Sequence, residues 1–311
     1  MKKYFIFALA ALTLTFAACG DKGNNPEPPA STDPEGDING NNPEPPAITA
    51  PEGAINGLFT INDRGKQVFF SKGNLQATYD GSSWTWSFAE HQWDCIGNQV
   101  ANTAISGNGK VSTNGTVDLF GWSTASTYYG INNSTNNDDY SGDFVDWSWN
   151  PISNGGNSPY RWRTLKLKEW VYLFYGRTDA AKLFSLGKVN GVNGTILLPD
   201  NWSGEKFDNA AKGLTDKGEY YNNSNGTNFT FHTYDGDAWD AMEKKGAVFL
   251  PAAGYRHGKG VGFVGSNGCY WSASSDSDGM SFAYYLYFYS NRLDPQHSYN
   301  RFLGQSVRLV R

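Results

Sequence analysis

The residue types best suited to chemistry lie near the end of the chain, and the chemistry that they favour is ligand binding. In residues 283–289, tyrosines alternate with Leu286 and Phe288, which is typical of a strand whose two faces differ. If Leu286 and Phe288 face a core, the tyrosines face outward, beside a polar tract at residues 290–301 that we expect to be a loop. Tyrosine gives a large rigid contact area, Ser and Asn add adaptable hydrogen bonds, and Arg adds a forked donor. We therefore expect ligand contacts from Tyr285, Tyr287, Tyr289, Asn291, Arg292, Asp294, His297, Ser298, Tyr299, Asn300 and Arg301.

Some of these tyrosines can instead cover the sheet, because aromatic side chains dominate buried area. We expect about half of them to be packing residues.

Residues for catalysis form no recognisable pattern in the sequence. The four histidines, His91, His232, His257 and His297, are far apart and lack the spacing of metal ligands. The chain contains no nucleophile elbow, phosphate-binding loop or HExxH helix. We expect no catalytic residue, no metal and no cofactor.

An acidic loop keeps calcium open as an alternative. Asp138, Asp139, Asp143 and Asp146 lie close together in the sequence, and calcium prefers such oxygen ligands. Residues 274–279 resemble the start of an EF-hand loop but lack its distal Glu. The carbohydrate-binding motifs of calcium-dependent lectins are also absent. A solvated acidic loop is the more ordinary interpretation.

The first residues have the pattern of a processing signal. A basic start is followed by a short apolar run and by small residues before Cys19, as in a bacterial lipobox. We expect a signal peptide at residues 1–18 and lipidation of Cys19, which anchors the protein to a membrane without spanning it. An ordinary secretory signal with an incidental cysteine is the alternative. Residues 23–39 and 40–56 form a tandem repeat rich in Pro, Gly, Asn and Glu, so residues 19–57 are expected to be an extended spacer.

Composition predicts one folded domain at residues 58–311, loop-rich and of the β or α+β class, with a core of large aromatics. A net charge of -5 argues against a nucleic-acid partner, which favours basic surfaces. Cys95 and Cys269 can form a disulfide in an exported protein, or can be two separate buried side chains.

Two helices are expected. The first covers residues 162–174, with Thr164 as N-cap and Trp170, Leu173 and Phe174 as its apolar stripe. The second covers residues 237–245, capped by Asp237 and ended by Gly246. Short strands are expected between residues 58 and 88, near residues 195–199 and at residues 247–256, whereas residues 98–157 are expected to be a long loop packed by Trp122, Trp147 and Trp149.

Five motifs in this order resemble the major paralogous (FISUMP) domain of bacterial surface lipoproteins. They are VFFSKGNL at 68–75, WRTL at 162–165 with Glu169 and Trp170, FLPAAGYR at 249–256, YWS at 270–272 and SVRLV at 306–310. The resemblance covers essentially all residues after the spacer. It favours the α+β class and implies a C-type-lectin-like fold, in which two helices flank a twisted antiparallel sheet and the last strands carry the ligand face. The same fold includes formylglycine-generating enzymes, but those depend on a closely spaced cysteine pair, and Cys269 stands alone here.

The resemblance also reaches the variable proteins of diversity-generating retroelements. In those proteins, mutagenesis at adenines leaves Tyr, Ser, Asp, His, Asn and Arg at exposed positions, but not Lys, Glu or Trp. Here no Lys follows Lys259 and no Glu follows Glu243, whereas Met280, Gln296 and Gln305 would have to be fixed. A paralogue with a fixed tyrosine-rich face is the alternative.

The sequence thus predicts a lipid-anchored, adhesin-like binding protein at the cell surface or outer membrane, without catalysis. Its ligand is a protein or a glycan. A calcium-assisted or stacking-based glycan-binding protein, a purely structural surface component, and a relative of formylglycine-generating enzymes are the alternatives.

Overall fold

The computed structural model describes residues 49–98, 100–223, 229–276 and 281–311. The predicted signal peptide, Cys19 and most of the predicted spacer lie outside the described residues, as do Asp278 and Met280. Residues 48–311 form one compact unit, and Ile55 is already buried in its core.

The unit is mostly sheet with few helices, which confirms the α+β class. Its largest sheet is antiparallel and has the strand order β11-β12-β19-β18-β17. These strands are Leu214–Asp216 (β11), Tyr221–Asn223 (β12), Arg292–Asn300 (β19), Phe282–Tyr289 (β18) and Asn267–Ser275 (β17).

The other strands form smaller sheets. A four-stranded sheet consists of Thr233–Tyr234 (β13), Phe184–Val189 (β9), Val192–Leu197 (β10) and Val248–Pro251 (β14). A three-stranded sheet consists of Trp84–Phe88 (β4), Leu75–Tyr79 (β3) and Gly115–Val117 (β7). The two-stranded pairs are Phe59–Thr60 (β1) with Gln67–Val68 (β2), Ile105–Gly107 (β5) with Lys110–Val111 (β6), Tyr255–His257 (β15) with Gly260–Gly262 (β16), and Leu309–Val310 (β20) with Arg163–Thr164 (β8).

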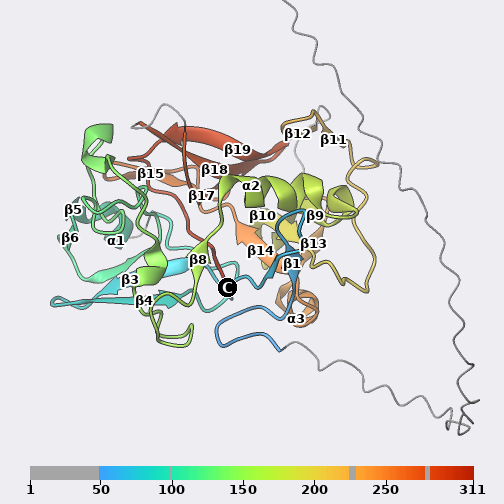
Figure 1. Ribbon diagram of the computed structural model, residues 1–311, viewed down its shortest axis with the longest axis horizontal. Helices are drawn as coiled ribbons and strands as arrows, with labels where there is room; N and C mark the ends of the chain where they lie inside the picture. Colours follow the sequence, from blue (N-terminus) through green and yellow to red (C-terminus); the bar gives the residue numbers. More distant parts are fainter. Residues whose placement is uncertain (1–48, 99, 224–228, 277–280) are drawn as a thin grey trace, which may run out of the picture. The chain divides into compact units, whose positions relative to one another are not determined.

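The described α-helices are Val100–Thr103 (α1), Leu167–Val171 (α2) and Gly236–Lys244 (α3). Helix α2 continues into a π-helical turn at Tyr172–Gly176, and it lies beside the strands of the largest sheet (Figure 1). Short 3-10 turns occur at Asn137–Tyr140, Trp147–Trp149 and Ala180–Lys182.

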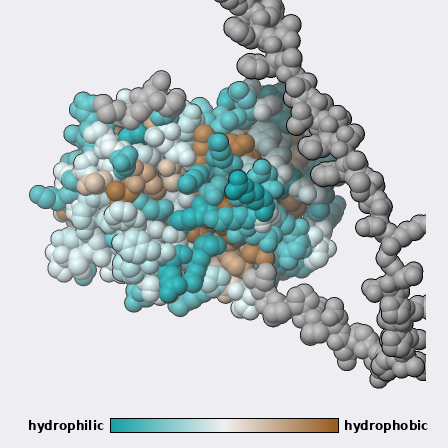
Figure 2. All heavy atoms as spheres, viewed as in Figure 1, coloured by the Kyte–Doolittle hydropathy of each residue, from teal (hydrophilic) through white to brown (hydrophobic). Residues whose placement is uncertain are grey.

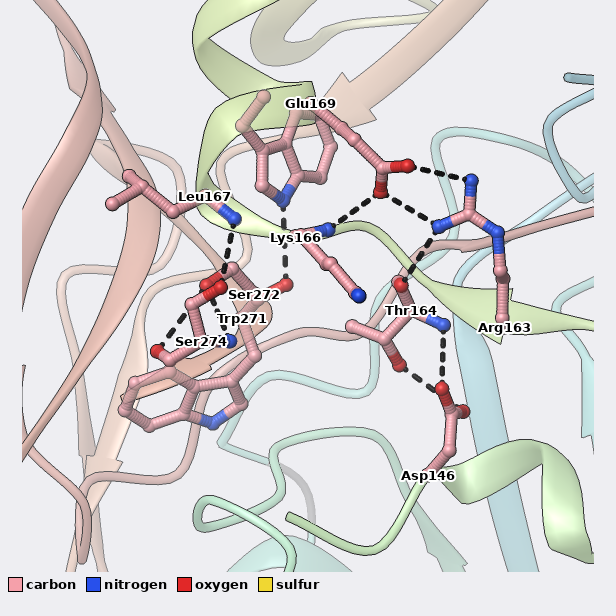
Figure 3. Close-up of polar contacts among 10 residues, drawn as sticks. Asp146, Arg163, Thr164, Lys166, Leu167, Glu169, Trp271, Ser272 and Ser274 are labelled. Atoms are coloured by element: carbon pink, nitrogen blue, oxygen red, sulfur yellow. Dashed lines mark hydrogen bonds and ion pairs between the residues drawn. The ribbon is translucent and has the colours of Figure 1, made fainter. Parts of the chain in front are cut away.

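Helix α2 begins later than the sequence predicts. Thr164 is not its N-cap, because the amide and the hydroxyl of Thr164 both donate to Asp146 (Figure 3). Thr164 lies instead in strand β8, which pairs with β20 at the end of the chain. The first free amides of the helix are bound instead by Glu169, which accepts from the amide of Lys166 at 2.8 Å, and by the hydroxyl of Ser274. The same Glu169 carboxylate makes a bidentate ion pair with Arg163. The predicted stripe of Trp170, Leu173 and Phe174 is buried, as expected.

Helix α3 is confirmed, with a correction at its start. Its N-cap is Asp235, whose side chain accepts from the amide of Ala238, and Asp237 lies inside the first turn. Gly246 follows the helix in a left-handed conformation, as predicted for its end.

The two ends of the described unit pair with one another. The amide of Phe69 donates to the carbonyl of Arg311, and the amide of Arg311 donates back to Phe69, both at 2.9 Å. Strand β20 also pairs with β8, so the last residues lie between two segments that are far away in the sequence. Residues 309–311 therefore connect the segment at Phe69 with β8.

Large aromatics fill the core on both sides of the largest sheet. Leu286 and Phe288 pack into one hydrophobic cluster with Trp170, whereas Trp271 and Tyr285 belong to a second. Trp122 and Trp147 are buried in the second cluster as predicted, but Trp149 is exposed. On the face seen in Figure 2, hydrophobic residues occupy only small separate areas.

Two further expectations need correction. The polar tract at residues 290–301 is not a loop, because most of it forms strand β19, paired with β18 along nearly its whole length. Cys95 and Cys269 are both free, so the disulfide alternative is wrong and separate side chains are correct.

Candidate functional site

One face of strands β17 and β18 is turned away from the first core cluster and forms the wall of a hollow. The register pairs Cys269 with Tyr287 and Asn267 with Tyr289, so these side chains share that face. Gly268 lies between them on the opposite face, where a Cβ would meet the ring of Phe288 at 1.9 Å. Glycine at this position lets the strand approach the core closely enough to form the wall.

A β-bulge brings His297 into the same wall. Tyr285 pairs with His297 and Tyr287 pairs with Asp294, so β19 has one more residue than β18 between the two pairs. Pro295 lies in the extra stretch, where a residue without an amide proton is tolerated. As a result, the His297 ring stacks on Tyr287 at 5.1 Å and meets Tyr285 edge-on at 5.2 Å.

Asp294 positions His297 from behind. One Asp294 oxygen lies 3.2 Å from His297 Nδ1 and accepts from Arg292 at 2.8 Å, and the other accepts from the amide of Gln296. Burial alone would raise the pKa of Asp294, but these hydrogen bonds outweigh it and hold the pKa below its usual value. Asp294 is thus an ionised side chain that orients the imidazole.

The phenols of the wall stay protonated at neutral pH. Burial raises the pKa of Tyr287 to about 12, and it raises the pKa of Tyr285 further. The Tyr287 hydroxyl accepts from Asn267 Nδ2 at 3.0 Å, which leaves its own proton available.

The hairpin β15–β16 and the turn after it form the opposite rim. The Tyr255 ring stacks on Phe263 at 5.2 Å with the rings nearly parallel. Phe263 has 56% of its surface exposed and a φ of +61°, which is costly for a bulky residue. Its carbonyl accepts from the amides of Ser266 and Asn267, so the turn keeps the ring at the mouth of the hollow.

The floor carries an unpaired amide. Gln305 is fully buried, and neither its side-chain oxygen nor its side-chain nitrogen has a hydrogen-bond partner. Its backbone is held by reciprocal hydrogen bonds with Phe120 at 2.8 and 2.9 Å, so the side chain has a fixed origin. A buried amide without partners costs free energy, so Gln305 is a candidate contact for a polar ligand.

The hollow has a volume of about 370 Å³. Among the described residues that line it, none is Asp, Glu, Lys or Arg. The lining consists of Tyr255, His257, Phe263, Asn267, Cys269, Tyr285, Tyr287, His297, Tyr299, Leu303 and Gln305.

Four of the predicted contact residues meet in this hollow: Tyr285, Tyr287, His297 and Tyr299. Tyr299 is 48% exposed at the rim, where it stacks on Phe282. Tyr285 does not face open solvent as predicted, since it is only 5% exposed beneath the second core cluster.

The remaining predicted residues lie outside the lining. Arg301 is a buried structural residue, because its guanidinium lies over Trp122 and donates to backbone carbonyls. Asp294 is buried behind His297, and Arg292 lies between Asp294 and the Tyr220 ring. The other four take part in contacts along β18 and β19: Tyr289 with Tyr287, Asn291 with Asn223, Ser298 with Asp276, and Asn300 with Asn137.

Sequence reasoning missed the half of the hollow contributed by other elements. Tyr255 and His257 belong to the motif at 249–256 and its extension, which marked a family resemblance but not a face. Phe263 carried a local signal, since a large apolar pair with Val264 between glycines at 262 and 265 is unusual in a buried strand. No local sequence signal marked Gln305, because its amide is unpaired only as a result of the three-dimensional arrangement around it.

The acidic loop is engaged in local structure. Asp146 binds Ser148 and Thr164, and Asp139 accepts from Ser134. Across the part of the chain that the structure describes, no group of three or more His, Cys, Asp or Glu side chains is arranged to hold a metal ion.

A second exposed aromatic site lies elsewhere. Trp149 and Tyr160, exposed by 49% and 70%, contact one another at 6.0 Å. Trp149 also borders a smaller hollow of about 210 Å³ with Tyr128 and Tyr129. None of the described residues that line this smaller hollow has a buried polar atom without a partner, as Gln305 has, so it is the weaker candidate for a ligand site.

Comparisons with protein-family models, with curated proteins and with solved structures found no match to this chain. None of the described helices is long and apolar enough to cross a membrane.

Proposed function

We propose that this protein is a non-catalytic binding protein that holds its ligand in the hollow formed by β15, β17, β18 and β19. The observation that carries the proposal is the combination of flat ring faces with an unpaired buried amide in one cavity. Pockets of this kind, mostly aromatic with a few placed polar groups, are typical of ligand sites.

The state of the thiol in the hollow supports binding over catalysis. Burial raises the pKa of the Cys269 thiol far above its usual value, and Cys269 is only 2% exposed. A reactive cysteine needs a thiolate and access to substrate, and both are disfavoured here. The formylglycine-generating alternative also requires a closely spaced cysteine pair, whereas Cys269 stands alone in the last part of the chain.

We propose a C-type-lectin-like fold of the FISUMP type for the compact unit. Pairing of the segment at Phe69 with the last residue, and helices beside the sheets, support this assignment. Lipidation at Cys19, a spacer up to residue 57 and a place at the outer membrane or cell surface complete the proposal from the sequence pattern alone.

Retroelement diversification of the hollow is a second candidate. The four predicted residues in the lining are all Tyr or His, types that adenine mutagenesis can produce, whereas the floor residue Gln305 is not such a type. Sequencing the locus in several isolates tests it. Substitutions concentrated at 285, 287, 297 and 299 with an unchanged Gln305 support diversification, and uniform low variation contradicts it.

Binding itself is tested by probing glycan and protein arrays with the full-length protein in a detergent that lacks a sugar head group. The variant Y287A/Y299A removes one ring from the wall and one from the rim, and Y160A serves as a matched control on the second aromatic site. We expect array signals that the double variant loses and Y160A keeps. Signals that survive the double variant and disappear in Y160A would contradict the proposal.

A further inference from the structure

We infer that the hollow takes a single neutral sugar residue, bound through direct contacts and without a metal ion. This inference rests on the proposed binding function and names its ligand class. It follows from three independent features of the lining: the amide at the floor, the ring faces at the wall and rim, and the absence of Asp, Glu, Lys and Arg among the described lining residues.

The floor matches a hydroxyl pair. The unpaired Gln305 amide offers one acceptor oxygen and one donor nitrogen side by side. Neighbouring sugar hydroxyls each act as donor and acceptor, so two of them can satisfy both amide atoms together. An apolar ligand would leave the amide orphaned, at the cost of an unmade buried hydrogen bond.

The ring faces match the other side of a sugar. Tyr255 and Phe263 present nearly parallel rings at the rim, and Tyr287 and His297 present a second stacked pair on the wall. A pyranose has C–H faces that pack on such rings while its hydroxyls point sideways. Phe263 keeps its ring at the mouth despite a left-handed backbone, which is the kind of strain that clusters at ligand sites.

The charge of the lining selects among sugars. No described lining residue is Lys or Arg, so a sialic or uronic acid carboxylate would find no permanently charged partner in the hollow. No described lining residue is Asp or Glu either, so the donor set does not suit calcium, which prefers carboxylate oxygens. A volume of about 370 Å³ is at the small end of the range for ligand pockets, which favours one residue over a long chain.

The experiment uses the full-length protein in a detergent without a sugar head group. The probes are oligosaccharides ending in glucose, galactose, mannose, N-acetylglucosamine or N-acetylgalactosamine, with matched chains ending in sialic or glucuronic acid. Array binding is measured with and without EDTA, and the strongest probe is then titrated calorimetrically. We expect neutral ends to bind equally in EDTA, and acidic ends to bind at least about tenfold more weakly.

Two variants link this binding to the hollow. Gln305→Leu removes both amide atoms at similar shape, so we expect at least about tenfold weaker binding together with an unchanged or higher melting temperature. A Gln305 of merely structural role would instead lower the melting temperature and leave the affinity unchanged. Phe263→Ala alters only an exposed ring, and we expect it to weaken the same probe several-fold even if Gln305→Leu fails to fold.

The outcomes separate this inference from the proposed function. Binding of a protein probe but of no neutral sugar, sugar binding that requires calcium, a preference for acidic ends, or full affinity in Phe263→Ala would each overturn the sugar inference and leave a binding protein. An absence of any Y287A/Y299A-sensitive signal on both arrays would overturn both.

Discussion

At the scale of single residues, the alternation in β18 correctly predicted which face of the strand each side chain lies on, but it did not predict how deeply the side chain is buried. It correctly separated Leu286 and Phe288 from the tyrosines, because side chains alternate along any strand. It could not show that Tyr285 lies under a second cluster while Tyr287 stays half open, since the covering residues come from distant segments. Polarity misled in the same way at Arg301, whose charge is buried over Trp122.

Asp118 provides a residue-scale prediction about pH. This buried carboxylate accepts from Ile96 N and Asn102 Nδ2, both at 2.7 Å, at the start of the segment that leads to Phe120 and so to Gln305. Burial raises the pKa of Asp118 to about 6. Because the folded protein binds this proton more tightly, the stabilisation is fully present below about pH 4 and is lost as the pH rises through about 6.

The measurement compares wild type with Asp118→Asn in urea unfolding from pH 7 to pH 4. A pKa raised from 3.8 to about 6 corresponds to about 3 kcal/mol in full, and most of it accrues by pH 4, so wild type should gain about 2 kcal/mol of unfolding free energy over the variant as the pH falls from 7 to 4. A free-energy difference that stays constant over this range would contradict the assignment.

At the scale of elements, the sequence located both longer helices and the strands between residues 59 and 88, β10, β14, β15 and β18, because their patterns are local, but it missed the other described strands. The bulge in β19 was not predictable, because the sequence around Pro295 does not determine which residues of β18 pair with which residues of β19. The start of α2 was wrongly predicted for a similar reason. Thr164 binds Asp146, eighteen positions earlier in the sequence, and therefore does not cap the helix. Local patterns therefore gave the elements, and long-range contacts decided how they meet at the hollow.

The rim turn after β16 provides an element-scale prediction. Both Phe263→Ala and Phe263→Gly remove the ring, but only glycine relieves the left-handed backbone at φ +61°. We expect the glycine variant to be more stable than the alanine variant by about 1 kcal/mol, while both lose ligand affinity equally. Thermal unfolding and binding measured on the pair check this, and equal stabilities would show that the turn stores no strain.

At the scale of the whole molecule, the chain forms one compact unit from residue 48 that is closed by its last residues. Composition indicated an aromatic core and a β or α+β class, because Gly, Asn, Trp and Tyr are abundant and helix formers are scarce. The position of the hollow could not follow from it, because its lining joins β15, β18, the turn at Phe263 and the segment at Gln305.

Closure by the chain end provides a prediction at this scale. Deleting residues 309–311 removes β20 and the reciprocal hydrogen bonds between Phe69 and Arg311, and it exposes the buried Phe70. We expect loss of cooperative unfolding in circular dichroism. Deleting residues 20–47 is the matched control, and it should leave the melting temperature unchanged. A truncated chain that still unfolds cooperatively near the wild-type temperature would show that closure is dispensable.

The most direct test of the central claim, that ligand binds in the hollow, is ¹⁹F NMR of the protein labelled with 3-fluorotyrosine. Each resonance is assigned by a Tyr→Phe variant, and the strongest array probe is then added. The account predicts that Tyr255, Tyr285, Tyr287 and Tyr299 shift, while Tyr128 and Tyr160 at the second aromatic site do not. Shifts confined to Tyr128 and Tyr160 would contradict it and move the binding site to the second aromatic site.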